Sequence, residues 1–180
     1  LTLAIQNAIT TPGDDIFFLE NHGLIVVTDT PEAALTLHET VNEKLRAHLG
    51  LTSPYYDTAL LETPDGFKSA STRLQSRVAS DPTALTEYPT TVLFPDQVVY
   101  GDSFSFNPDT PAKITVHPRT GEITYRCGYK EALAIEETLA AWQYLYDTIK
   151  EVGLTRRTLS AAEGVFIANL DSEKYRKSIL

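Results

Sequence analysis

The chain has little cysteine and few positive charges. Among its 180 residues the single cysteine is Cys127, which excludes an intrachain disulfide and a zinc site built on paired cysteines. Lys and Arg number 15 against 24 Asp and Glu, so the net charge is −9 at pH 7. A chain this acidic repels phosphate backbones and anionic lipid, and no apolar run approaches the roughly 20 residues of a membrane-spanning helix. We therefore expect no nucleic-acid partner and no membrane partner, and one free thiol fits a reducing, cytoplasmic setting.

The chain also contains no methionine. A natural reading frame begins with Met, so we expect that Leu1 is not the natural start and that the chain is the later part of a longer protein. The first residues lack the basic region of a signal peptide. A functional site shared with an upstream segment of the same protein would then look incomplete in this chain.

Several motifs with known chemistry are missing. No glycine-rich GxGxxG follows a strand, and there is no Walker loop, no GxSxG nucleophile elbow, no HExxH and no HxH. Hydrophobic residues nevertheless make up 42% of the chain and charged residues 22%, which is the balance of an ordinary folded domain. The sequence therefore predicts a globular fold without a nucleotide-binding loop.

The first part of the chain predicts a β-hairpin followed by a helix. Two apolar runs, 16–19 and 24–27, flank Asn21-His22-Gly23, and because each is apolar on successive residues we expect the hairpin to be buried on both faces. Thr30 and Pro31 are a favourable helix start, apolar residues then recur at helical spacing, and Gly50 ends the helix. A short helix is also predicted over residues 3–9.

The remaining sequence predicts further strands and helices. Residues 92–100 are interpreted as two short strands bent at Pro95, and 114–117 with 122–126 as a hairpin. The predicted helices are a short one over 69–79, a long one from Gly128 to Glu151, one opened by a capping box at Ser160, and one over 171–177. The sum is an α/β or α+β fold with a mixed sheet.

Among the four histidines, His22 is the candidate ligand. It lies at a hairpin bend beside a glycine that permits close approach, and neutral imidazole is a common metal ligand. The alternative is a histidine that is hydrogen-bonded at a turn. His38 and His48 lie ten residues apart on the first long helix and are expected on its solvated surface, and His117 at an exposed strand end.

Other reactive side chains have simpler interpretations. Arg126 next to Cys127 can lower the pKa of the thiol, but an inert, half-buried thiol is the commoner case. Glu136 and Glu137 are expected on a solvated helix face. The basic stretch 174–177 can meet a phosphate or a neighbouring subunit, although we expect a frayed, solvated tail. The carboxylates expected to be turn residues are Asp14, Asp15, Asp29 and Asp96.

One segment resembles a known family. The run Phe17-Phe18-Leu19-Glu20-Asn21-His22-Gly23-Leu24-Ile25-Val26-Val27, followed by Thr30-Pro31-Glu32-Ala33-Ala34, resembles the C-terminal signature of the class II aldolase/adducin family over residues 15–49. Two later segments, 93–100 and 172–176, look like the longer bacterial members that are related to rhamnulose-phosphate aldolase.

The resemblance implies a fold and a chemistry. It implies a three-layer α/β/α class II aldolase-like fold with a mixed, largely antiparallel sheet followed by C-terminal helices. Residues 1–50 would be the end of the aldolase-like domain, and 51–180 a C-terminal extension packed on it within one domain. His22 would be one ligand of a divalent metal, usually zinc, while the other two ligands, an upstream His-x-His, and an upstream acid are not in this chain.

Two functions follow from the resemblance as expectations. The first is a zinc-dependent lyase of carbohydrate metabolism that cleaves a small-molecule sugar phosphate in a retro-aldol reaction through a metal-stabilised enediolate. Epimerases and decarboxylases share that metal site, so the reaction type stays open. The alternative is a non-catalytic, adducin-like binding or oligomerisation module. Family members commonly form homo-oligomers, and a homo-oligomer is therefore expected.

Overall fold

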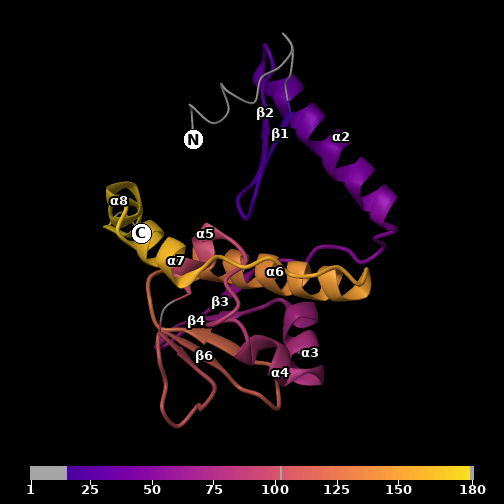
Figure 1. Ribbon diagram of the computed structural model, residues 1–180. Coiled ribbons are helices and arrows are strands. Elements are labelled where there is room, and N and C mark those ends of the chain that lie inside the picture. The colour runs from indigo at the N-terminus through magenta and orange to yellow at the C-terminus, as the bar shows by residue number, and fades with distance from the viewer. Residues whose placement is uncertain (1–15, 102, 179–180) are drawn as a thin grey trace. The chain divides into compact units, whose positions relative to one another are not determined.

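The computed structural model describes residues 16–101 and 103–178 (Figure 1). The chain divides after Thr52 into two compact units. The helix predicted over residues 3–9 and the turn residues Asp14 and Asp15 lie outside the described residues. Across the described part of the chain, no helix combines the length and the apolar character needed to cross a membrane.

The first unit contains the predicted hairpin and helix. Strand β1 (Ile16–Leu19) pairs antiparallel with β2 (Gly23–Val26), in a register that joins Ile16 to Val26 and Leu19 to Gly23. Helix α2 (Pro31–Leu49) follows β2. The Thr30 side chain accepts a hydrogen bond from the Ala33 amide at the start of α2, and Gly50 takes the left-handed conformation at its end, with φ 67°. The hairpin and both helix ends are thus as the sequence predicted.

The hairpin is not buried on both faces, as its apolar runs had suggested. Phe18 is 63% exposed, Val27 52% and Ile16 41%. The reason is that β1 and β2 form a sheet of only two strands, and α2 packs against β2. In the described residues of this unit, Val41 is the one buried apolar side chain.

The second unit is built on a five-stranded sheet in the order β3-β4-β7-β6-β5. All neighbours in this sheet are antiparallel except β5 and β6, which are parallel. The strands are β3 (Leu60–Thr63), β4 (Gly66–Ser69), β5 (Phe104–Ser105), β6 (Ile114–Val116) and β7 (Ile123–Tyr125). The predicted hairpin of β6 and β7 is confirmed, and the unit is a mixed α/β fold.

The helices of this unit gather around α6 (Tyr129–Glu151), which contacts β4 and two of the shorter helices (Figure 1). The others are α3 (Thr72–Ser80), α4 (Pro82–Thr86), α5 (Pro95–Tyr100), α7 (Ala161–Ala168) and α8 (Asp171–Ser178). The predicted apolar stripe of α6 enters the core, where Ile135, Leu139 and Trp142 are fully buried. These side chains pack against Ile114, Ile123 and Leu74 of the same core.

Two parts of the second unit differ from the prediction. Residues 92–100 were interpreted as two strands bent at Pro95. Instead, Pro95–Tyr100 form helix α5, because Pro95 occupies the first helical position, which needs no amide donor. The hairpin of β3 and β4 was not predicted. Its turn ends at Gly66, with φ 137°, where a side chain would collide with the Tyr125 carbonyl of β7. Only glycine therefore lets β4 pair closely with β7.

Candidate functional site

The tip of the first hairpin presents His22 to solvent. The His22 amide donates a hydrogen bond to the Leu19 carbonyl at 3.1 Å, which closes the turn between β1 and β2. Asn21 has a positive φ of 52° and Gly23 a φ of 133°, so both neighbours take conformations that few residue types adopt. The backbone of His22 is thus fixed by a tight turn, while its side chain is exposed.

The described residues do not complete a metal site around His22. A catalytic zinc needs about three protein ligands. Within 16–101 and 103–178 there is no group of three or more His, Cys, Asp or Glu side chains placed to hold a metal ion. His22 fits the role of one imidazole ligand, but the chain's described residues do not fit a whole site, so no catalytic step is derived from them.

The other three histidines lie on α2 and after β6. His38 and His48 are exposed on α2, as predicted, and the His38 Nδ1 lies 3.1 Å from the Asn42 side-chain amide. His117 follows β6, as expected, but it is half-buried rather than exposed. Its Nδ1 accepts hydrogen bonds from the Arg119 and Thr120 amides, both at 3.3 Å, so it stabilises the turn between β6 and β7. None of these contacts calls for a ligand.

A buried carboxyl group was missed by the sequence analysis. Glu136 was expected on a solvated face of α6, but its side chain is fully buried, whereas Glu137 is exposed as expected. Ser69 of β4 donates to one Glu136 oxygen at 2.7 Å, and the Tyr125 hydroxyl of β7 donates to the other. Burial raises the pKa of Glu136 above its ordinary value, against the opposing effect of these two hydrogen bonds.

This cluster is closed to substrates. Ser69 is 2% exposed and Tyr125 0%, and burial together with the neighbouring carboxylate raises the pKa of the Tyr125 hydroxyl well above its ordinary value. None of the described surface hollows reaches Glu136. The cluster therefore fixes the position of α6 against β4 and β7, and it has a structural rather than a catalytic role.

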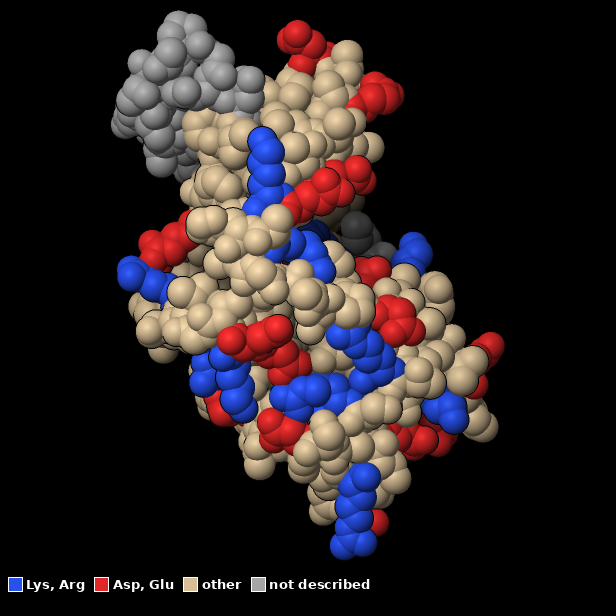
Figure 2. Space-filling model, turned by 90° about the vertical axis from the view of Figure 1, so that its right-hand side faces the viewer, with Lys and Arg blue, Asp and Glu red and all other residues tan. Residues whose placement is uncertain are grey.

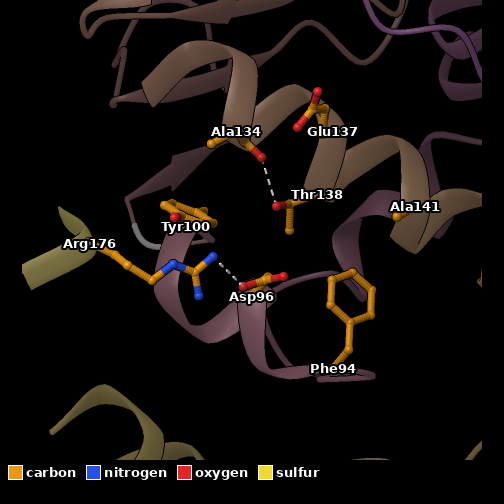
Figure 3. Close-up of a pocket in the computed structure, with 8 residues that line it drawn as sticks. All are labelled: Phe94, Asp96, Tyr100, Ala134, Glu137, Thr138, Ala141 and Arg176. Atoms are coloured by element: carbon orange, nitrogen blue, oxygen red, sulfur yellow. Dashed lines mark hydrogen bonds and ion pairs between the residues drawn. The ribbon is translucent and has the colours of Figure 1, made fainter. Parts of the chain in front are cut away.

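A surface hollow of about 310 Å³ lies between α5, α6 and α8 (Figure 3). Its charged side chains are Asp96, Glu137 and Arg176. Arg176 bonds Asp96 at 3.1 Å and Glu173 at 2.9 Å, and its guanidinium lies 5.6 Å from the centre of the Tyr100 ring. The Arg176 charge is thus matched by two carboxylates, and the hollow does not favour a phosphate group.

The ion pair of Arg176 corrects two predictions. Asp96 was expected to be a turn residue, but it lies in the first turn of α5, where a carboxylate is favoured by the helix dipole. The helix predicted over 171–177 is confirmed as α8, but its basic stretch at 174–177 is not the frayed tail that was expected, because Arg176 links α8 to α5. The sequence gives no sign of this pair because its members are 80 residues apart.

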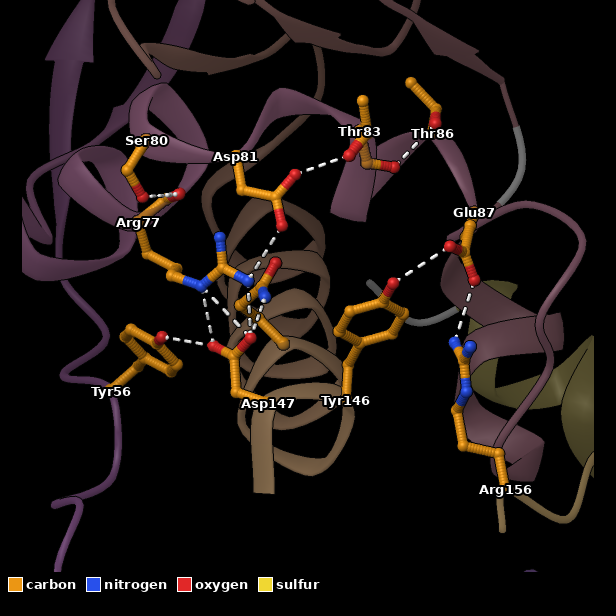
Figure 4. A network of polar contacts seen from close by, with 11 residues as sticks. Tyr56, Arg77, Ser80, Asp81, Thr83, Thr86, Glu87, Tyr146, Asp147 and Arg156 are labelled. Carbon is orange, nitrogen blue, oxygen red and sulfur yellow. Dashed lines mark hydrogen bonds and ion pairs between the residues drawn. The ribbon is translucent and has the colours of Figure 1, made fainter. Parts of the chain in front are cut away.

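Two polar networks connect α6 to its neighbours (Figure 4). Asp147 accepts a forked pair of hydrogen bonds from Arg77 of α3, at 2.6 and 3.0 Å, and a third from Tyr56 at 2.8 Å. Burial and the bond to Asp147 raise the pKa of Tyr56. Both oxygens of Asp147 accept hydrogen bonds from residues of the fold, so this carboxylate stabilises the fold rather than being left for a ligand.

The second network lies near the same C-terminal end of α6, on the opposite side of the helix (Figure 4). Glu87 accepts hydrogen bonds from the Tyr146 hydroxyl at 2.9 Å and from Arg156 at 2.8 Å, and these bonds lower the pKa of the Glu87 carboxyl. The Arg156 guanidinium also stacks 4.6 Å from the centre of the Tyr146 ring. This contact joins α6 to the chain that leads into α7.

Cys127 is not activated. The thiol is half-buried, and burial raises its pKa to about 11, with the carboxylate of Glu131 acting in the same direction. The position of Arg126 next to Cys127 suggested that the arginine could lower the pKa of the thiol, and that interpretation is wrong. Little thiolate forms at neutral pH, which agrees with the inert thiol that was the simpler reading.

Comparison with known proteins adds no relative to this picture. No protein-family model, no curated protein and no solved structure matches the chain. The resemblance of residues 15–49 to the class II aldolase/adducin signature therefore rests on the motif in the sequence.

Proposed function

We propose that this chain belongs to a metal-dependent, class II aldolase-like lyase that cleaves a sugar phosphate, and that His22 is one of its metal ligands. The observation that carries the proposal is the exposed imidazole of His22 at the tip of the β1–β2 turn. The three-layer α/β/α arrangement is part of the same proposal. The proposal also places the remaining metal ligands outside the described residues.

The local geometry supports a ligand role for His22. A metal ligand has to be held in place by the backbone while its ring stays accessible to the ion and to the other ligands. The hydrogen bond from the His22 amide to Leu19 and the four paired residues of each strand provide that support. His38, by comparison, has its ring nitrogen beside the Asn42 side chain on a helix surface.

The proposed metal would have one chemical role. A divalent cation would polarise the carbonyl and hydroxyl oxygens of the substrate and stabilise the negative charge that forms as the carbon–carbon bond breaks. The part of His22 is to bind and orient that cation. The hollow beside Arg176 does not favour a phosphate group, because Arg176 is already paired with two carboxylates.

The test is metal binding by two matched variants. His22→Ala and His38→Ala each remove an exposed histidine from the first unit. Zinc affinity is measured by competition with a chelator, and bound zinc by mass spectrometry after dialysis. Loss of a ligand is expected to weaken binding at least ~100-fold for His22→Ala, since even loss of a partner behind a ligand costs 10–100-fold. His38→Ala is expected to bind as the wild type does.

Two outcomes would contradict the proposal. If His22→Ala keeps the wild-type zinc affinity and circular dichroism spectrum, His22 is not a ligand. If the wild-type protein binds no divalent metal and releases no aldehyde from a panel of sugar phosphates, the non-catalytic, adducin-like module becomes the better description. Loss of both zinc and cleavage in His22→Ala alone supports the lyase.

A further inference from the structure

A hollow of about 220 Å³ lies between α6 and the segment that leads into β3. Three tyrosines, Tyr55, Tyr56 and Tyr144, form much of its wall, and Glu137 is the one charged residue among its described lining. Pockets for drug-sized ligands measure about 300–1,000 Å³. The size of the hollow therefore suits a single chemical group at the end of a ligand.

The α6 side of the hollow follows from helical spacing. Glu137, Ala140, Ala141 and Tyr144 stand at positions i, i+3, i+4 and i+7, so they share one face of the helix. The two alanines end at Cβ, which leaves room between the carboxylate and the ring. This face of α6 thus carries an acidic and an aromatic side chain with a space between them.

The opposite wall is held in place by contacts with α3 and α6. The Tyr56 hydroxyl donates a hydrogen bond to Asp147 at 2.8 Å, and the Arg73 guanidinium lies 4.8 Å from the centre of the Tyr56 ring. The Tyr55 ring packs on Tyr144, with the ring centres 4.5 Å apart, and it remains 60% exposed. A wall that is already ordered binds a ligand at a lower entropic cost.

The Glu137 carboxylate is unmatched within the fold. Among residues 16–101 and 103–178 no hydrogen bond or ion pair engages it. Figure 3 shows it apart from the Asp96–Arg176 pair of the neighbouring hollow, which Glu137 also lines. The net charge of −9 further disfavours an anionic ligand at this surface. A neutral ligand would leave the carboxylate charge unmatched, so the charges favour a cation.

We propose that this hollow, which we call the Glu137 hollow, binds an alkylammonium group. The charged nitrogen lies beside the Glu137 carboxylate, and its carbon substituents contact the tyrosine rings. Aromatic rings attract cations that lie within about 6 Å of their centres, and the contact between Arg73 and Tyr56 is an instance within this chain. The group belongs to a free small amine or to the lysine side chain of a partner. This inference does not depend on the metal-dependent function proposed above.

The test is a titration of the whole chain with tetramethylammonium, followed by nuclear magnetic resonance. We expect saturable shifts of amide signals from residues 55–58 and 137–144. The dissociation constant is expected in the millimolar range, because the probe is small. tert-Butanol is also compact and covered with methyl groups but has no charge, and it is expected to bind at least ~3-fold more weakly.

Three variants locate the site. Glu137→Gln removes the charge and is expected to weaken tetramethylammonium binding about 3- to 5-fold, as for a partly exposed charge pair. Tyr55→Leu removes the most exposed ring and is expected to weaken it about 2- to 5-fold. Ala141→Leu fills the hollow and is expected to abolish binding. Glu151→Gln is the matched control, because it removes an exposed carboxylate of the same helix outside the hollow. The control is expected to bind as the wild type does.

Three outcomes would overturn the proposal. The first is the absence of saturable shifts at the named residues, and the second is binding of tert-butanol as tightly as tetramethylammonium. The third is equal weakening by Glu137→Gln and Glu151→Gln, which would show only a general attraction of cations to an acidic protein. The variants are expected to fold, since Glu137 has no partner in the described fold and alanine and leucine both favour helix.

A second probe separates the two sources of the alkylammonium group. Nα-acetyl-lysine amide presents the primary ammonium of a lysine side chain. Tighter binding of this probe than of tetramethylammonium supports the proposal with a partner's lysine as the ligand. Weaker binding supports it with a free methylated amine as the ligand.

Discussion

The carboxyl group of Glu136 is an ionisable group buried within the second unit. It is fully buried and receives hydrogen bonds from Ser69 and Tyr125. A buried carboxylate is costly even with partners, and this is why burial raises its pKa from the ordinary value of 4.5. The folded protein therefore binds the Glu136 proton more tightly than the unfolded chain does.

The raised pKa predicts a pH dependence of stability. The contribution of the bound proton is fully present below the unfolded pKa and is lost as the pH rises through the folded pKa. Glu136→Gln keeps the size of the side chain but cannot ionise. We expect the free energy of unfolding of Glu136→Gln to improve relative to wild type as the pH is raised from about 4.5, by about 1.4 kcal/mol for each unit of raised pKa.

Glu137→Gln is the control for this experiment, because the neighbouring Glu137 is exposed. Urea unfolding of both variants and the wild type over a range of pH measures the effect. Glu137→Gln is expected to follow the wild type at every pH. A constant difference between Glu136→Gln and wild type across the range would mean that the Glu136 pKa is not raised.

At the scale of elements, the two networks on α6 differ in exposure and hence in expected strength. The Arg77–Asp147 pair is largely covered, with side chains 21% and 26% exposed, and its bonds are forked. The Arg156–Glu87 pair is more open, at 36% and 43%. Water competes less for the covered pair, so it contributes more to holding α3 against α6.

This difference predicts unequal effects of two alanine substitutions. Asp147→Ala leaves Arg77 and Tyr56 without their main acceptor and is expected to cost about 1–3 kcal/mol, between the values for exposed and buried pairs. Arg156→Ala is expected to cost less than about 1 kcal/mol. Chemical denaturation of both variants measures the two losses. Equal losses would show that the forked pair with Arg77 gives no advantage over the open one.

For the whole molecule, the two units differ in how much apolar surface they bury. The second unit contains an extended core, whereas the described part of the first has one buried apolar side chain, Val41. Charged side chains show no comparable contrast, because basic and acidic side chains are interspersed over the face of the molecule that Figure 2 shows. Local stability should therefore follow the apolar contacts.

This contrast predicts a difference in hydrogen exchange. Amides of α6 from Ala132 to Thr148, which line the core, are expected to exchange slowest, and amides of α2 to exchange through local opening at lower free energy. Mass spectrometry of peptides from the two helices measures this in one experiment. Helix α2 has a capped start at Thr30 and a glycine at its end. Equal protection of α2 and α6 would therefore show that α2 is stabilised by more than its own caps and Val41.

The sequence by itself determined the elements that depend on neighbouring residues. The β1–β2 turn, the Thr30 and Gly50 ends of α2, the capping box of α7 and the apolar stripe of α6 all arise from local hydrogen bonding and spacing. Short apolar runs were less informative, and 92–100 was assigned to strands because a run of that length fits either a strand or a helix. The later strands β3 and β4 lacked a strong pattern of their own.

Tertiary structure decided everything that depends on residues far apart in the chain. Glu136 is buried because β4 and β7 bring Ser69 and Tyr125 to it, and the Arg176 pair with Asp96 spans 80 residues. No spacing rule reveals such partners, because burial and charge pairing depend on the folded neighbours. The motif around His22 was visible from sequence for the opposite reason, since a hairpin turn is formed by residues that are adjacent in the chain.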